Sequence, residues 1–162
     1  MKSWGAFCAG LMCAALTTTA VGQSISFPRG QGALKPGEST SLRKATIEPG
    51  PIVLPGPEVP ESVRGLSGRW AGWMCVARTC SAALEVVSLT AKGGRLRHVQ
   101  VNPHLGDYDL FPIPIDVSLV NGNELEGRWR YISIKVRLRP DGNVDIIRHS
   151  GVLSWGVLSR IP

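Results

Sequence analysis

The chain has 162 residues, of which 43% are hydrophobic and 19% charged, and its formal net charge is +6 at pH 7. Residues 1–22 are an N-terminal leader, which is described next. The rest of the chain is long enough for one modest folded core. Beyond that leader no stretch is apolar enough to cross a bilayer, which excludes a membrane-spanning segment in the rest of the chain.

Residues 1–22 are typical of a secretory signal peptide. Lys2 supplies a positive charge, an uncharged stretch follows, and small residues lead up to Gly22. The apolar part has about 13 residues, fewer than the ~20 of a spanning helix, so we expect cleavage rather than an uncleaved anchor. The sequence thus predicts a periplasmic or secreted protein that is not an integral membrane protein after cleavage. In that compartment we expect no nucleic-acid partner.

Export also affects the cysteines. Cys8 and Cys13 would leave with the leader, and Cys75 and Cys80 would remain as an even pair in an oxidising compartment. Their spacing suits a disulfide that clasps a tight hairpin. The alternatives are a redox-active pair or half of a metal site. Redox motifs usually have Cys-x2-Cys, and the chain has no second ligand pair for a metal.

Residues 23–64 have the composition of a disordered tether rich in proline and glycine. Proline lacks the amide donor that helices and central strands need, and few residues here could be buried to offset chain entropy. The run 48–60, EPGPIVLPGPEVP, predicts an extended spacer. A docking strip anchored by Ile52-Val-Leu54 is the alternative.

Residues 65–162 show the alternation of β-strands. In Ile132–Arg139 every second residue is apolar and the residues between are polar, which predicts a strand with one buried face. Asn121-Gly-Asn123 and Pro140–Asn143 have the chemistry of tight hairpins. We therefore predict an all-β domain, a small antiparallel up-and-down β-barrel or sandwich of about eight strands.

The ends of this domain carry a recognisable pattern. Leu66-Ser-Gly-Arg-Trp70 opens the first expected strand, and Gly151-Val-Leu153 and Arg160 lie at the far end. Over residues 65–162 the chain resembles the calycin-type barrels, lipocalin-like or avidin-like, and small exported bacterial barrels of that kind. The resemblance implies that Trp70 and Arg160 pack across the closed end of the barrel.

Tryptophans are the first candidates for a binding site. Trp73, Trp129 and Trp155 could line a pocket for an apolar or sugar ligand, because aromatic rings provide a large stacking surface. Trp70 and Trp73 differ by three positions, so they point to opposite faces of a regular strand and at most one faces the interior. Simple filling of a small barrel is the alternative role for these rings.

Basic residues are the second candidates. Most of the positive charge falls in residues 65–162, and a candidate basic face is made by Arg128, Arg130, Lys135, Arg137 and Arg139. Such a face could attract an anionic envelope component or an acidic protein. The alternative is a solvated face whose charges prevent aggregation.

The sequence offers little for catalysis. His98, His104 and His149 are scattered, and no nucleophile or phosphate-loop motif is present. His104, Asp107 and Asp109 have suitable atoms for a metal, but two carboxylates and one imidazole in a polar turn are usually just a loop. We expect no enzymatic activity, cofactor or metal. The leading hypothesis is an exported binding protein, and the second is a structural or interaction module of the cell envelope that uses the basic face.

Overall fold

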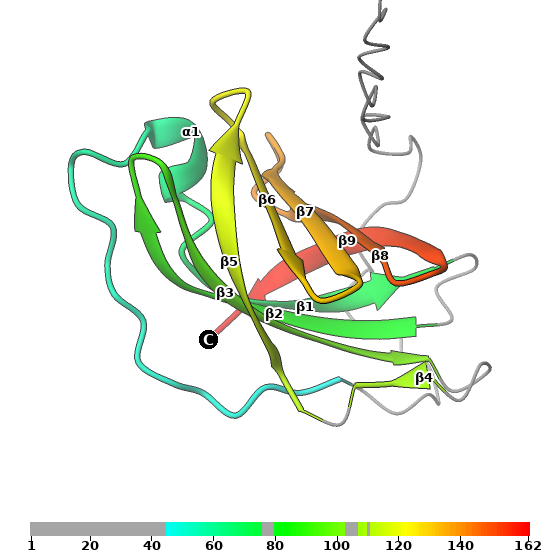
Figure 1. Ribbon diagram of the computed structural model, residues 1–162. Coiled ribbons are helices and arrows are strands. Elements are labelled where there is room, and N and C mark those ends of the chain that lie inside the picture. Colours follow the sequence, from blue (N-terminus) through cyan, green and yellow to red (C-terminus); the bar gives the residue numbers. More distant parts are fainter. Residues whose placement is uncertain (1–44, 76–79, 103–106, 110) are drawn as a thin grey trace, which may run out of the picture.

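The computed structural model describes residues 45–75, 80–102, 107–109 and 111–162, so the expected signal peptide and the first part of the expected tether lie outside the described residues. The elements are α1 (Glu61–Arg64), β1 (Gly68–Met74), β2 (Cys80–Thr90), β3 (Gly93–Asn102), β4 (Asp107–Tyr108), β5 (Ile113–Val120), β6 (Glu124–Trp129), β7 (Ile132–Leu138), β8 (Val144–His149) and β9 (Leu153–Ile161) (Figure 1). None of the described helical residues forms a segment with the length and apolar character of a bilayer span.

The strands close into a barrel. Each of β1, β2, β3, β5, β6, β7, β8 and β9 pairs antiparallel with the next, and β9 returns to pair with β1. The short β4 adds to the end of β3. The prediction of an antiparallel all-β domain is confirmed, and the architecture is an eight-stranded up-and-down barrel rather than a sandwich. Closure pairs the outer strands of the meander, β1 and β9, with each other.

The interior is filled by the apolar side of each strand. In β7, Ile132, Ile134 and Val136 are buried, and Ser133 and Lys135 between them are half-buried on the outside. The same alternation holds along β5. An eight-stranded barrel is just wide enough for side chains to fill it. Most of its length is therefore a packed core.

One end of the barrel is sealed. The Trp70 side chain, from β1, is buried in the barrel and donates its Nε1–H to the Leu66 carbonyl at 2.9 Å. The guanidinium of Arg160, from β9, lies 4.2 Å from the centre of the Trp70 ring and donates to the carbonyls of Ser67 and Gly65 at 3.0 and 2.6 Å. α1 packs against β7 at this end.

Residues 45–59, hereafter the strap, run along the outside of the barrel to α1 (Figure 1). The Ala45 amide donates to Ser81 Oγ at 2.5 Å, and the Val53 amide donates to the Val87 carbonyl at 2.8 Å. Residues 45–64 fall within the expected tether, but the structure holds them against the barrel. The difference arises because the strap finds backbone partners on β2 that composition does not reveal.

A buried carboxylate fixes the strap. The Glu85 side chain, on the outer face of β2, is only 1% exposed and accepts hydrogen bonds from Arg69 at 3.0 Å and from Arg97 at 2.6 Å. It also accepts the Gly50 amide at 3.3 Å. The two arginines in turn donate to the carbonyls of Gly50 and Glu48. This network, the Glu85 clamp, joins β1, β2 and β3 to the strap.

The expected disulfide between Cys75 and Cys80 is present. It joins the end of β1 to the start of β2, with 5.6 Å between the two Cα atoms. This distance lies in the usual range for disulfides. The bond lies at the end of the barrel opposite α1, which is also the end that carries the candidate site described next.

Candidate functional site

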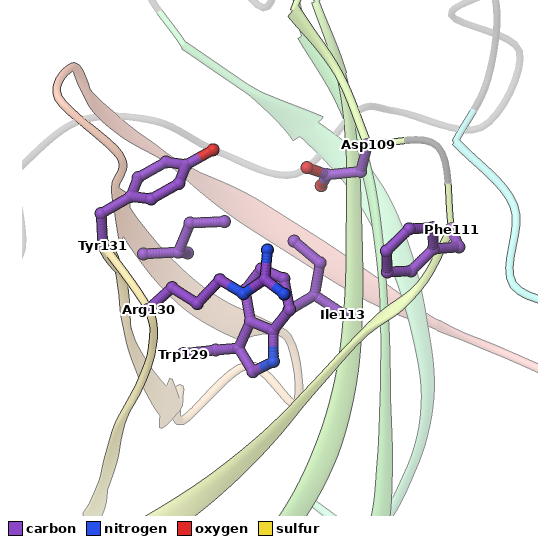
Figure 2. A pocket seen from close by; sticks show the side chains of 7 residues that line it. Asp109, Phe111, Ile113, Trp129, Arg130 and Tyr131 are labelled. Carbon is purple, nitrogen blue, oxygen red and sulfur yellow. The ribbon is translucent and has the colours of Figure 1, made fainter.

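A pocket lies at the open end of the barrel, opposite the sealed end. Its volume is about 170 Å³, and it is lined by Asp109, Phe111, Ile113, Trp129, Arg130, Tyr131 and Ile132 (Figure 2). The lining comes from the segment before β5 and from the hairpin between β6 and β7. The pocket therefore suits a small molecule or a single inserted side chain.

The hairpin between β6 and β7 builds one wall of the pocket. Trp129 pairs with Ile132, so Arg130 and Tyr131 form a two-residue turn. Arg130 has a φ of +53°, a value that residues other than glycine, asparagine and aspartate seldom adopt. Its guanidinium lies 4.4 Å from the centre of the Trp129 ring (Figure 2). The strained backbone thus lies beside the stacked cation and ring of the pocket wall, and strain of this kind is common at functional sites.

Two substitutions at Arg130 separate the strain from the stacking. Glycine accepts positive φ without a steric cost, whereas alanine retains the strain, and both remove the stacked guanidinium. We expect Arg130→Gly to be more stable than Arg130→Ala by ~1 kcal/mol. Urea unfolding of the two variants measures this difference. Equal stabilities would show that the turn relaxes without cost, so that no strain is stored there.

Exposed apolar residues gather around the same end. Phe111 is 57% exposed and Tyr131 69%, and Val152 and Leu153, in the turn from β8 into β9, are 58% and 41% exposed. Isolated exposed apolar residues are ordinary, but several around one opening mark a contact surface. Aromatic and arginine side chains are also those that most often dominate binding energy. The rim of the pocket therefore has the composition of a binding surface.

A buried ion pair lies beside the pocket. Asp109 lines the pocket and binds Arg148 of β8 through two hydrogen bonds of 2.5 and 2.9 Å. The side chains are 7% and 3% exposed, respectively. The Asp109 carboxylate also accepts a hydrogen bond of 2.7 Å from the backbone N–H of Gln100. Since these bonds hold its carboxylate in place, the pair joins the segment before β5 to β3 and β8.

Further polar side chains surround this ion pair inside the barrel. His98 and Gln100 project inward from β3, and Ser154 projects inward from β9; all three are buried. Gln100 Nε2 donates to Ser154 Oγ at 3.3 Å and to Cys75 Sγ at 3.7 Å. We call His98, Gln100 and Arg148 the inner polar cluster. None of the three residues lines the pocket; His98 is the cross-strand neighbour of Ile113, which does.

Several atoms of the inner polar cluster have no partner among the described residues. They are both ring nitrogens of His98, Oε1 of Gln100 and Nε of Arg148. Burial, and next the positive charge of Arg148, lower the pKa of His98 to about 3, so its imidazole is neutral near pH 7. A neutral imidazole has one donor and one acceptor. The cluster therefore presents both donors and acceptors, and its one cation is already balanced by Asp109.

The structure separates the tryptophans that the sequence proposed as ligand-binding. Trp129 points inward and lines the pocket. Trp73 and Trp155 lie on the outer faces of β1 and β9, where Trp73 is paired with Val157. They do not reach the pocket. Trp70 is at the sealed end with Arg160, as described above.

The candidate basic face is also divided. Arg128, Lys135 and Arg137 lie on the outside of β6 and β7, but Arg130 is at the tip of the hairpin. Carboxylates alternate with the cations on this surface: Lys135 pairs with Glu124 and Glu126, Arg137 with Asp145 and Glu124, and Arg139 with Asp141 and Asp145. The face is thus a ladder of mixed charge rather than a basic ridge.

Several residues of the site could not be recognised from the sequence. Arg148 and Gln100 were not singled out, because nothing in their local sequence shows which partners they meet across the barrel. The inward position of Arg148 could have been read from the alternation of β8, in which Val144 and Ile146 share its face. Asp109 was considered as a metal ligand together with His104 and Asp107. It is bound by Arg148, and His104 lies outside the described residues.

A second and larger hollow of about 300 Å³ lies between the strap and the outer faces of β1 and β2. Ala45, Ile47 and Ala83 contribute apolar surface to it, and Glu85 is at its edge. The Glu85 carboxylate at this hollow already accepts hydrogen bonds from Arg69 and Arg97, so it is engaged within the protein. The pocket at the open end of the barrel, with its stacked cation and ring and its exposed apolar rim, has the stronger chemistry for a ligand.

Comparison of the chain with models of protein families, with curated proteins and with solved structures finds no significant match.

Proposed function

We propose that the protein is an exported, non-enzymatic binding protein of calycin type, which takes a small ligand at the open end of its barrel. The observation that carries the proposal is the asymmetry of the two ends. One end is sealed by Trp70, Arg160 and α1, and the other has a pocket with a rim of exposed aromatic residues. A rigid barrel with loops around one open end is a common scaffold for ligand binding.

Export is supported by two features. The leader has the order of a signal peptide, and the bond between Cys75 and Cys80 is of a kind that persists in oxidising compartments. We therefore place the protein in the periplasm or outside the cell. A ligand there would be a small molecule of the envelope or the surroundings, or a side chain of a partner protein.

The alternative function, an envelope module that uses the basic face, has weaker support. Lys135, Arg137 and Arg139 all have carboxylate partners on the same surface. A surface of alternating charge attracts an anionic polymer less than a run of unpaired cations would. The pocket is therefore the better basis for a function.

The proposal is tested by titrating the purified protein with indole, a small uncharged ring that matches the size of the pocket. We expect the nuclear magnetic resonance signals of Trp129 and Tyr131 to shift saturably. Tyr131→Ala should weaken indole binding at least ~5-fold, because the side chain supplies an exposed aromatic wall. Its folding stability should change by less than ~0.5 kcal/mol, as is usual for exposed positions.

The matched control is Leu54→Ala. Leu54 is 84% exposed and lies in the strap, remote from the pocket. This variant should bind indole as the unaltered protein does. Shifts spread over the whole surface, or shifts confined to residues beneath the strap, would contradict the proposed site.

A further inference from the structure

The wall of the pocket at the open end contains two charged residues, Asp109 and Arg130, and its other five residues are aromatic or aliphatic. The two charges differ in their surroundings. The Asp109 side chain is 7% exposed and accepts two hydrogen bonds from Arg148, so its charge is compensated within the protein. The electrostatic attraction that the pocket offers a ligand therefore depends on Arg130.

The positive charge of Arg130 is not compensated by a carboxylate. Among the residues that the structure describes, its side chain is exposed and forms no ion pair, and its one charge-related contact is with the Trp129 ring. Other arginines of the barrel differ from it in this respect. Arg95, Arg137 and Arg139 each have an aspartate oxygen between 2.8 and 3.0 Å away. Arg130 thus provides the pocket wall with a cation that is open to a ligand.

The contact with Trp129 orients this cation without using its hydrogen-bond donors. The Arg130 guanidinium lies 4.4 Å from the centre of the Trp129 ring, and Figure 2 shows the side chain reaching from the turn into the space among the lining residues. A guanidinium is planar, and its five N–H groups lie in that plane. Stacking on a ring uses the face of the group, so the N–H groups stay available for an acceptor.

The shape of the guanidinium favours one kind of anion. A carboxylate is also planar, and its two oxygens can accept two parallel N–H bonds from the same arginine. Because Arg130 is exposed at the rim, a carboxylate bound to it keeps part of its hydration, and the cost of burying the charge is small. The exposed rings of Phe111 and Tyr131 offer contact to an apolar group attached to that carboxylate.

We propose that the pocket selects a small organic anion, a flat apolar group that carries a carboxylate, and that Arg130 binds the carboxylate. This inference rests on the proposed function and adds the charge and the chemical class of the ligand. The apolar part lies against the aromatic side chains of the pocket, and Trp129 holds the guanidinium in position from below. Asp109 does not repel the anion, because Arg148 compensates its charge.

The test uses three flat molecules of nearly equal size: benzoate, which is an anion, benzamide, which is uncharged, and benzamidinium, which is a cation. Each is titrated into the purified protein at pH 7 and followed by the nuclear magnetic resonance signals of Trp129 and of Nε–H of Arg130. At low ionic strength we expect benzoate to bind at least ~5-fold more tightly than benzamide, and benzamidinium to bind most weakly. At about 0.5 M salt this difference should shrink to less than ~2-fold, because salt screens exposed charges.

Substitutions at Arg130 identify the source of the preference. Arg130→Gln removes the charge, and the ratio of benzoate to benzamide affinity should then fall close to one. Arg130→Lys keeps the charge and should keep a preference for benzoate. Each ratio compares two ligands on the same variant, so a general change in the shape of the pocket cancels. The control is Arg128→Gln, which removes a charge from the outer face of β6 two positions away and should leave the ratio unchanged.

The outcomes distinguish this inference from the proposed function. If indole binds at the pocket but benzoate has no advantage over benzamide, or keeps its advantage in Arg130→Gln, this inference is wrong while the binding function stands. If neither indole nor any of the three benzene derivatives binds, the proposed function fails as well.

Discussion

Replacing Asp109 with alanine is expected to lower the free energy of unfolding by ~3–5 kcal/mol, because it leaves the buried guanidinium of Arg148 without a counter-ion. The side chains of the pair are 7% and 3% exposed, so water cannot replace the lost carboxylate readily. The substitution also removes the side-chain acceptor of the backbone N–H of Gln100. Urea unfolding followed by tryptophan fluorescence measures the change.

The chain offers a matched control for this prediction. Asp116 and Arg95 also form an ion pair across neighbouring strands, but their side chains are 77% and 60% exposed. Asp116→Ala should therefore cost less than ~1 kcal/mol. The double variant Asp109→Leu with Arg148→Met should recover most of the stability, since an apolar pair needs no compensation. Equal effects at Asp109 and Asp116 would mean that water reaches the pair of Asp109 and Arg148.

Removing the carboxylate of the Glu85 clamp should have the second largest effect. We expect Glu85→Ala to lower the free energy of unfolding by ~2–4 kcal/mol, less than for a fully buried pair because Arg69 and Arg97 are partly exposed. The strap should also detach, because the two arginines hold the carbonyls of Gly50 and Glu48 only while Glu85 orients them. Limited proteolysis should then cut the strap while the barrel stays intact.

Lowering the pH should weaken the Glu85 clamp, as the substitution Glu85→Ala does. Burial by itself raises the pKa of Glu85, but hydrogen bonds from Arg97, the Gly50 amide and Arg69 outweigh it and hold the pKa below the usual 4.5. A carboxyl group with a lowered pKa stabilises the fold above its unfolded pKa, and this stabilisation is lost as the pH falls through the folded value. The difference in stability between the unaltered protein and Glu85→Ala should thus shrink below about pH 4.5.

The control for the clamp is Glu126→Ala, which alters a glutamate of β6 that is 39% exposed and pairs with Lys135. It should cost less than ~1 kcal/mol and leave the strap resistant to protease. Should Glu85→Ala lose stability without any change in proteolysis, the strap would be held by its backbone bonds to Ser81 and Val87 instead.

The strands could be predicted because their signals are local. Alternation in β7 and the Asn121-Gly122 turn, where both residues have positive φ, are determined by neighbours in sequence. The spacing of Trp70 and Trp73 likewise placed them on opposite faces, as the structure has them. The turn at Arg130 and Tyr131 contains no glycine, which is the usual local signal for positive φ, so the backbone conformation of Arg130 could not be predicted from its neighbours.

The strap and the candidate site could not be predicted in the same way, because their partners are distant in sequence. Arg97 meets the Glu48 carbonyl across 49 positions, and Arg148 meets Asp109 across 39. Composition suggested a tether because it counts prolines, whereas order depends on whether the backbone finds donors and acceptors elsewhere. Only the closed arrangement of strands brings His98, Gln100 and Arg148 together.

The pairing of β1 with β9 has a consequence for the order in which the molecule assembles. Arg69 lies opposite Ile161. The backbone hydrogen bonds of β1 are therefore complete only after β9, the last strand, has paired with it. Contacts between such distant segments require closure of a long loop and make folding slow. A chain that emerges from its N-terminus onward keeps the pairing groups of β1 available to other strands until β9 arrives. Truncation after β8 should therefore give a product that associates with itself rather than a smaller barrel.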